Sequence, residues 1–437
     1  MKQKTLIYSL LLFCLPFGDL SAQEKLDLKE AITIALQNNY NIKLSNNENK
    51  IAENDLRYGK TALLPSLTGN LNDVNNIQTS NVDLANGETR EANNAKTTNL
   101  SYGVSLNWRI FDGFQMFANY DRLQELEKLG DLNAKLTVQT TIADVIEAYY
   151  NLASQKKQLA AIQTALEVSE VRLKNAQSRY TLGKGAKLEL LAAKVDLNTD
   201  TTQLLMQQDL IKNGKIRLNQ LMSRDLKTDF DIDDDISIDK RLVYENLKTA
   251  ADTQNPDVRT AEINKTISEI YVKQVKANRY PVISLNSGYN FSKSTSPPTS
   301  FSLRSNTKGF NYGLTASINI FNGWQQNRSE KNAKLLLDNA NLDFERIKQD
   351  VDAQLLTSFQ SYQTSLRLIS LEEKNVEVAE ENLKITLEKY RLGSIVPLEL
   401  REAQRNYMDA NARYANALYQ AKISEITLKE IIGNISL

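Results

Sequence analysis

The segment LSYGVSLNWRIFDG (residues 100–113) occurs a second time, with changed letters, as FNYGLTASINIFNG (310–323). In both copies every second residue is apolar, and the residues between them are mostly serine, threonine, asparagine or glycine. A period of two over about ten residues predicts a β-strand with one apolar face. The sequence therefore predicts a strand in each half of the chain, placed at the same point of a repeated pattern.

Each copy ends in a short polar residue followed by glycine. Asp112 and Asn322 can accept hydrogen bonds at the start of a helix, and Gly113 and Gly323 can adopt the backbone of a sharp turn. We predict that these four residues form the turns at which a strand passes into a helix.

The duplication extends over most of the chain. RYTLG, ending at Gly183, recurs as KYRLG, ending at Gly393, and both pairs of motifs are 210 residues apart. Upstream, Pro65 and Pro281 are related by 216 residues, so the spacing changes inside the polar stretches 76–98 and 293–308. We expect two structural repeats, 23–222 and 244–437, joined by an acidic linker at 223–243.

Each repeat is expected to contain a helix, two strands, a long helix and a shorter helix. Residues 324–392 contain no Gly or Pro, and their apolar residues recur at spacings of three and four, which is typical of a coiled-coil helix. Gly183 and Gly393 are placed where a left-handed residue would end each long helix. The expected ranges are strands at about 65–75, 99–110, 282–292 and 309–321, long helices at 114–181 and 324–391, and shorter helices at 28–60, 187–221, 244–279 and 397–432.

The N-terminus is typical of a signal peptide. Lys2 and Lys4 precede a short apolar stretch, and Ala22 ends a small-residue cleavage site, so we expect residues 1–22 to be removed on export. The single cysteine, Cys14, lies in this segment. The mature chain then has neither Cys nor His.

Composition argues against several classes of function. Lys and Arg balance Asp and Glu at 53 each, so a nucleic-acid partner is not expected. Without Cys and His, thiol nucleophiles, imidazole bases and the commonest metal ligands are missing, and we expect no enzyme, no cofactor and no metal site. The acidic run 229–239 lacks the Gly and Glu of a calcium loop, and Gly183-Lys184-Gly185 lacks the pattern of a phosphate loop.

The strands suggest a membrane location. Small polar residues opposite aliphatic and aromatic ones fit a barrel with lipid outside and water inside, although a one-sided sheet on a soluble core remains an alternative. Four strands cannot close a barrel, and open edges are not tolerated in lipid, so membrane strands would require several copies. Three copies would supply twelve strands.

Together, the paired turns and the paired Y-x-L-G motifs resemble the TolC family of outer-membrane efflux proteins, over nearly the whole mature chain. The resemblance implies a mainly α protomer with a transmembrane β part: four strands in a trimeric twelve-strand barrel and a long coiled-coil tunnel in the periplasm. It also implies an inner-membrane pump (RND or ABC type) and a periplasmic adaptor. The adaptor-contacting residues would be Tyr180, Leu182, Gly183, Tyr390, Leu392 and Gly393; the alternative is that these residues only form the turns.

The family often narrows its tunnel with acidic rings, and the matching positions are Glu399 and Glu402, which share one helical face. An ordinary solvated helix face is the alternative. The function expected is a passive outer-membrane conduit that exports small molecules. Alternatives are a conduit for type I protein secretion and a soluble, structural coiled-coil protein of the envelope.

Overall fold

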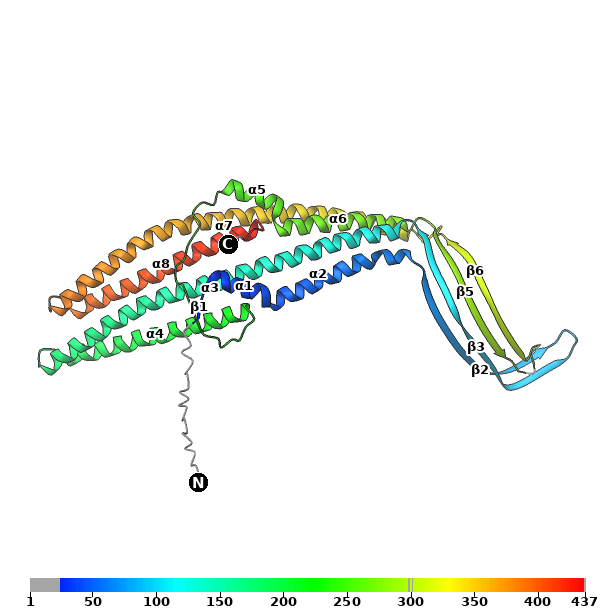
Figure 1. Cartoon of the computed structure of the whole chain (residues 1–437), viewed down its shortest axis with the longest axis horizontal. Coiled ribbons are helices and arrows are strands. Elements are labelled where there is room, and N and C mark those ends of the chain that lie inside the picture. Colours follow the sequence, from blue (N-terminus) through cyan, green and yellow to red (C-terminus); the bar gives the residue numbers. More distant parts are fainter. Residues whose placement is uncertain (1–23, 298, 301, 436–437) are drawn as a thin grey trace, which may run out of the picture.

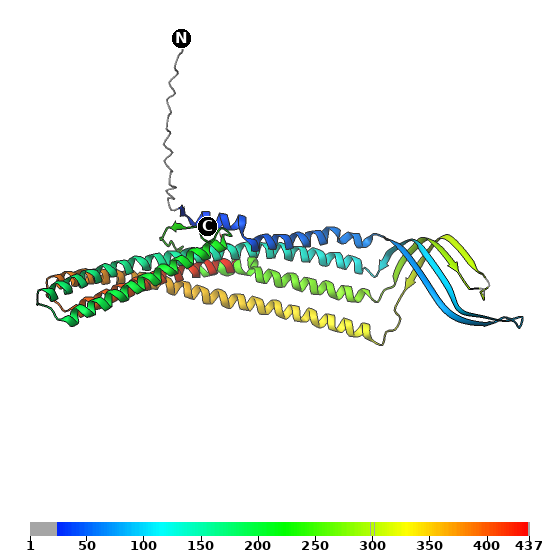
Figure 2. The same cartoon turned by 90° about the horizontal axis from the view of Figure 1, so that it is seen from below.

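The computed structural model describes residues 24–297, 299–300 and 302–435, so the expected signal peptide and Cys14 lie outside the described part. The described chain is elongated, with a body of helices at one end and a curved sheet at the other (Figure 1). The helices run along the long axis of the molecule (Figure 2).

The sheet contains four antiparallel strands in the order β2-β3-β5-β6. The sequence repeat relates the strand pairing in the two hairpins. Leu67 pairs with Leu106 in the first hairpin, and the equivalent residues of the second repeat, Ile283 and Ala316, pair with each other in the second. The repeats are joined by the pairing of β3 with β5, in which Ser105 lies opposite Gly288. The strands are β2 Ser66–Asp83, β3 Thr89–Asp112, β5 Val282–Thr295 and β6 Arg304–Ser317.

The strand ends differ from the expected ones. The first hairpin continues through 76–98, where the sequence has no apolar alternation, because backbone pairing between β2 and β3 needs no apolar side chains. In the second hairpin β6 begins at Arg304 but ends at Ser317, short of the expected 321. Residues 318–321 have no strand beside them, whereas the matching end of β3 pairs with Ile283 and Val282.

The long helices form two hairpins with the helices that follow them. The chain reverses at 182–186 and again at 392–396, and both reversals lie at the end of the molecule remote from the sheet (Figure 1). These helices are α3 Gln115–Thr181, α4 Lys187–Leu221, α7 Gln325–Arg391 and α8 Pro397–Ile431. Each helix of the first hairpin is related to its counterpart by 210 residues, the spacing of the sequence motifs.

The helices expected to be continuous at 28–60 and 244–279 are each broken by an asparagine. The side-chain oxygen of Asn39 accepts from the amides of Asn41 and Ile42, and that of Asn255 accepts from Val258. Capping of this kind ends one helix and begins another. The resulting elements are α1 Leu28–Asn38, α2 Tyr40–Gly59, the 3-10 turn η1 Lys60–Leu63, α5 Tyr244–Gln254 and α6 Pro256–Ala277.

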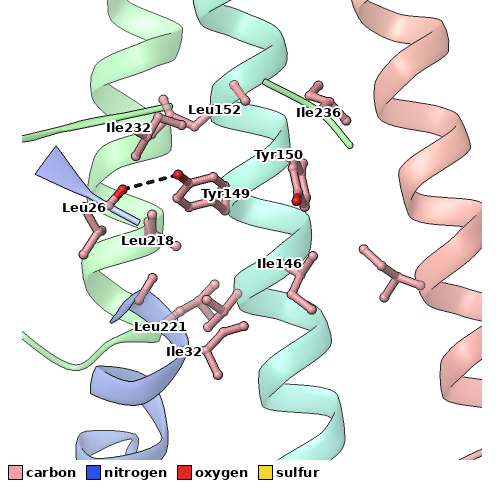
Figure 3. Packing of buried hydrophobic residues seen from close by; sticks show 14 of the residues in the cluster. Leu26, Ile32, Ile146, Tyr149, Tyr150, Leu152, Leu218, Leu221, Ile232 and Ile236 are labelled. Atoms are coloured by element: carbon pink, nitrogen blue, oxygen red, sulfur yellow. Dashed lines mark hydrogen bonds between the residues drawn. The ribbon is translucent and has the colours of Figure 1, made fainter. Parts of the chain in front are cut away.

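A small second sheet ties the start of the chain to the segment between the repeats. Strand β1 Glu24–Leu26 pairs in parallel with β4 Phe230–Ile232. The Tyr149 hydroxyl of α3 donates to the Leu26 carbonyl at 3.3 Å within a buried apolar cluster (Figure 3). The sequence did not predict this sheet.

The acidic segment is held by lysines. Asp231 binds Lys156 at 2.5 Å, and Asp234 lies 3.6 Å from Lys157, both on α3. These two carboxylates are therefore partners of structural ion pairs, and the described residues contain no cluster of ligands suited to a metal ion.

Helices in the described part of the chain are not sufficiently long and apolar to cross a membrane.

Candidate functional site

One face of the four-strand sheet is polar. Asn70 donates to Ser105 at 3.2 Å, and Asn286 donates to Thr315 at 3.0 Å, so the small polar side chains of neighbouring strands bind one another across this face. Within the part shared by all four strands this face has no charged residue; Arg109, which lies beyond the start of β2 at Ser66, is 3.9 Å from Asp112. The face offers hydrogen-bonding groups to water with almost no charge.

The opposite face is apolar and aromatic. Tyr102 of β3 stacks on Phe291 of β5 with ring centroids 5.0 Å apart, and Phe291 meets Tyr289 edge to face. Phe310 and Tyr312 continue the row on β6, where both are exposed in the single chain. An exposed aromatic and aliphatic face of this extent requires a covering that one chain does not supply.

The two strand-to-helix turns have the expected residues in the expected conformations. Asp112 accepts from the amide of Met116 at 3.1 Å, and Asn322 accepts from Gln326 at 3.2 Å. Gly113 and Gly323 have φ angles of +69° and +62°. In each turn the following residue is also left-handed, which the sequence did not indicate.

The surroundings of the two glycines differ. A Cβ on Gly113 would lie 2.4 Å from the carbonyl oxygen of Ala277, whereas a Cβ on Gly323 would meet nothing within 4 Å. The first turn is therefore covered by the second repeat, and its counterpart is open in the single chain.

The helical tips also have the expected turn geometry. Gly183 and Gly393 have φ angles of +71° and +72°, and the next amide in each case binds a carbonyl five residues back, at Arg179 and Lys389. The glycine amides also donate, to the carbonyls of Tyr180 and Tyr390, and these two hydrogen bonds close the C-terminus of each long helix. Leu182 and Leu392 are left 71% and 80% exposed at the ends of the hairpins.

The two tip tyrosines are not equivalent. Tyr180 is 41% exposed, but Tyr390 is only 4% exposed and packs with Val168, Leu383 and Leu400. Burial raises the pKa of Tyr390. Within the chain Tyr390 joins the two hairpins, so the exposed tip surface consists of the other five residues singled out from the sequence.

Glu399 and Glu402 lie on the exposed side of α8, one turn from the tip. The opposite side of the same turn is buried through Leu400 and Ala403. Both glutamates therefore point away from α3, to the surface of the single chain.

A buried polar network lies behind these glutamates. Asp200 of α4 has no exposed surface and binds Arg401 of α8 at 2.8 Å, and Gln404 of α8 donates to Asp200 at 3.0 Å and to Ser169 of α3 at 2.9 Å. Next to it, Arg172 binds Asp196 at 2.5 Å. The network joins three helices from both repeats, and nothing in the apolar periodicity indicated it.

A helical body with two coiled-coil hairpins, joined to a sheet with one polar and one apolar face, is the architecture of an outer-membrane channel protomer. The family model described as "Outer membrane efflux protein" matches residues 31–224 and 248–434. The chain belongs to the outer membrane efflux protein family, and the predicted fold class and outer-membrane location are confirmed.

Individual relatives are distant. The chain is 20% identical over 358 residues to the outer membrane protein TolC of Escherichia coli, covering 79% of this chain and 72% of TolC. It is 22% identical over 358 residues to the cation efflux system protein CusC of the same organism, covering 78% and 75%. Its fold is similar to that of the Campylobacter jejuni CmeC outer membrane channel, with a TM-score of 0.77, 18% identity, and coverage of 93% of this chain and 85% of CmeC.

Proposed function

We propose that three copies of this chain close a twelve-strand barrel in the outer membrane and form a passive conduit for the export of small molecules. The observation that carries the proposal is the open sheet: β2 and β6 each have one unpaired edge in the single chain. Unpaired backbone groups are costly in lipid, and pairing β6 of one copy with β2 of the next removes both edges.

The repeat supplies the geometry of that pairing. Ser105 and Gly288 are paired between the repeats, and their repeat-related positions are Thr315 and Asn72. If the contact between copies follows the contact between repeats, Thr315 of one copy lies opposite Asn72 of the next. By the same relation, residues 318–322 of one copy would pair with the start of β2 in the next copy, and that copy would cover Gly323.

The polar face of the sheet then lines the barrel, and the apolar face meets lipid. A lumen of Asn, Ser, Thr and Gly lets hydrated solutes pass without a strong preference for charge. No catalytic role is proposed for any residue.

The helical hairpins suit contact with other parts of an export system. We assign Leu182 and Leu392, with Tyr180, Gly183 and Gly393, to the surface that a periplasmic adaptor contacts, because each hairpin end has an exposed leucine that is otherwise without a covering. An inner-membrane pump of the RND or ABC type would supply energy. Secretion of proteins through a type I system uses the same partners and is the alternative cargo.

Glu399 and Glu402 are assigned to the constriction of the tunnel. In a trimer they bring six carboxylates together, which favours cations at the entrance. The test is a planar bilayer measurement on the purified protein, comparing block by a multivalent cation in wild type and in Glu399→Gln/Glu402→Gln.

Weaker block in the double variant supports the assignment, and Asp409→Asn, which removes an exposed charge elsewhere on α8, should leave the block unchanged. Unchanged block in the double variant contradicts the constriction. If the wild-type protein forms no channels at all, the conduit itself is contradicted.

A further inference from the structure

Charged residues are distributed unevenly over the two faces of the sheet. On the apolar face of β5 and β6 three cations gather at the end remote from the helices: Lys293 on β5, and Arg304 and Lys308 on β6. Lys293 lies opposite Asn306, so Arg304 and Lys308 are its diagonal neighbours on the same face, within about 8 Å. The one anion on this face within the four-strand part is Asp73, on β2, with β3 between it and β5.

We call Lys293, Arg304 and Lys308 the cationic patch. All three are exposed, and none forms an ion pair with an acidic side chain in the described part of the chain. Three neighbouring positive charges repel one another, so a negatively charged ligand would stabilise this arrangement.

The patch lies at the border of the apolar band. On β3 the apolar face runs from Leu100 to Ile110, a length of about 34 Å at 3.4 Å per residue. A strand tilt of about 40° reduces this to about 26 Å, which matches the apolar height of a membrane barrel. Leu100, at the outer end of the band, is paired with Lys293.

Aromatic rings mark the same border. Lys308 is paired with Phe291, which stacks on Tyr102, and Phe310 follows two residues later on the same face. Aromatic residues in membrane barrels gather at the interface between hydrocarbon and headgroups. Lys308 therefore lies level with these rings, Lys293 lies level with Leu100 at the end of the band, and Arg304 lies beyond it.

The geometry points to a binding site for the phosphate groups of lipid headgroups in the outer leaflet. The patch is at the end of the sheet opposite the helices, and the helices lie in the periplasm, so this border faces the outside of the cell (Figure 1). Lys and Arg bind phosphate through charge-assisted hydrogen bonds. The inference rests on the proposed barrel, because only there does this face meet lipid.

The competing explanation is that the lysines merely keep an exposed strand edge soluble. The test is native mass spectrometry of the full-length trimer, with a lipid A that carries two phosphates as the probe and the same lipid without phosphates as the reference. The variant is Lys293→Gln/Arg304→Gln/Lys308→Gln. The matched control, Lys174→Gln/Lys194→Gln/Lys212→Gln, removes three exposed charges from the helical hairpin α3–α4.

We expect the patch variant to retain the phosphorylated lipid about tenfold less than wild type or the control, and the phosphate-free lipid equally. Equal retention in all three proteins overturns the inference. Should the triple variant not assemble, Lys308→Gln and Lys308→Arg provide the comparison, and only the first should lose lipid. Failure of wild type to form a membrane-inserted trimer would instead contradict the proposed conduit.

Discussion

Asp200 carries a carboxylate at a position with no solvent exposure, bound to Arg401, Gln404 and Ser169. At the repeat-related positions the chain has Ala410 in place of Asp200 and Leu191 in place of Arg401. The repeat-related positions therefore carry no charge, and Leu191 is 48% exposed in the single chain.

We predict that Asp200→Asn lowers stability by about 2 kcal/mol, because it removes the nearer of the two carboxylates that face Arg401 and leaves only Asp196, at 3.7 Å. The measurement is thermal unfolding of the detergent-solubilised protein by circular dichroism. The double variant Asp200→Ala/Arg401→Leu copies the other repeat and should recover much of the loss. A single variant as stable as wild type would mean that water reaches Arg401.

Glu430 on α8 should respond to pH. Burial raises its pKa above the ordinary 4.5, and the charges of Asp144 and Glu147 raise it further. A raised carboxyl pKa means that the folded state binds the proton more tightly, so this group adds stability as pH falls through its folded-state pKa. We expect Glu430→Gln to raise the melting temperature at pH 7 by a few degrees, and the gain to shrink toward pH 5.

Glu372 is the control, because its pKa is shifted in the opposite direction to that of Glu430. A hydrogen bond from Asn375 and the Arg413 guanidinium lower its pKa, so its contribution is present at neutral pH and is lost as pH falls. Glu372→Gln should therefore lower the melting temperature at pH 7. If both variants shift in the same direction, the assigned pKa directions are wrong.

The turn residues could be predicted and the buried network could not. Gly113, Gly183, Gly323 and Gly393 are required by local backbone geometry, which a short motif specifies. Burial of Asp200 depends on α8 lying beside α3, more than two hundred residues away along the chain, and no local pattern reports that contact. The burial of Tyr390 was missed for the same reason.

At the scale of elements, the hairpin tips carry the assigned adaptor surface. We predict that Leu182→Asp/Leu392→Asp abolishes export in cells, seen as raised susceptibility to exported compounds, because a charge at each exposed leucine opposes apolar contact. Channel conductance in bilayers should stay near the wild-type level, since neither leucine belongs to the barrel or to the assigned constriction.

Lys184→Gln is the control at the same tip and should affect neither readout. Normal export by the double leucine variant would place the adaptor elsewhere on the helical body.

The ends of helices and strands could be predicted from the sequence where particular side chains determine them. The long helices begin and end within one residue of the predicted positions, because Gly residues and strand turns limit them. Strand ends were predicted poorly because backbone pairing decides them: β2 and β3 continue through a polar stretch, and β6 stops where no neighbour exists. The breaks at Asn39 and Asn255 required recognition of a capping residue inside an apolar pattern.

At the scale of the whole molecule, the repeat relates every contact between the two halves to an expected contact between copies. The chain supplies one covered turn, one open turn and two open strand edges, and each open feature has its complement on the same chain. Heterologous contacts of this kind close into a ring when the rotation permits it. Twelve strands are a workable barrel size, which favours three copies.

The most direct test of the closed trimer is a disulfide across the expected contact between β6 and β2. The only cysteine of the sequence is Cys14, in the expected signal peptide, so Asn72→Cys/Thr315→Cys introduces the only thiols of residues 23–437. Opposed residues on antiparallel strands have Cα atoms about 4.5–5.5 Å apart, within reach of a disulfide. After oxidation in membranes, we expect a ladder of covalent dimer and trimer on a non-reducing gel. Asn72→Cys/Leu314→Cys, in which the second side chain points to the other face, should stay monomeric. Only monomer from Asn72→Cys/Thr315→Cys, or equal amounts of covalent dimer and trimer from both double variants, would contradict the closed trimer in this register.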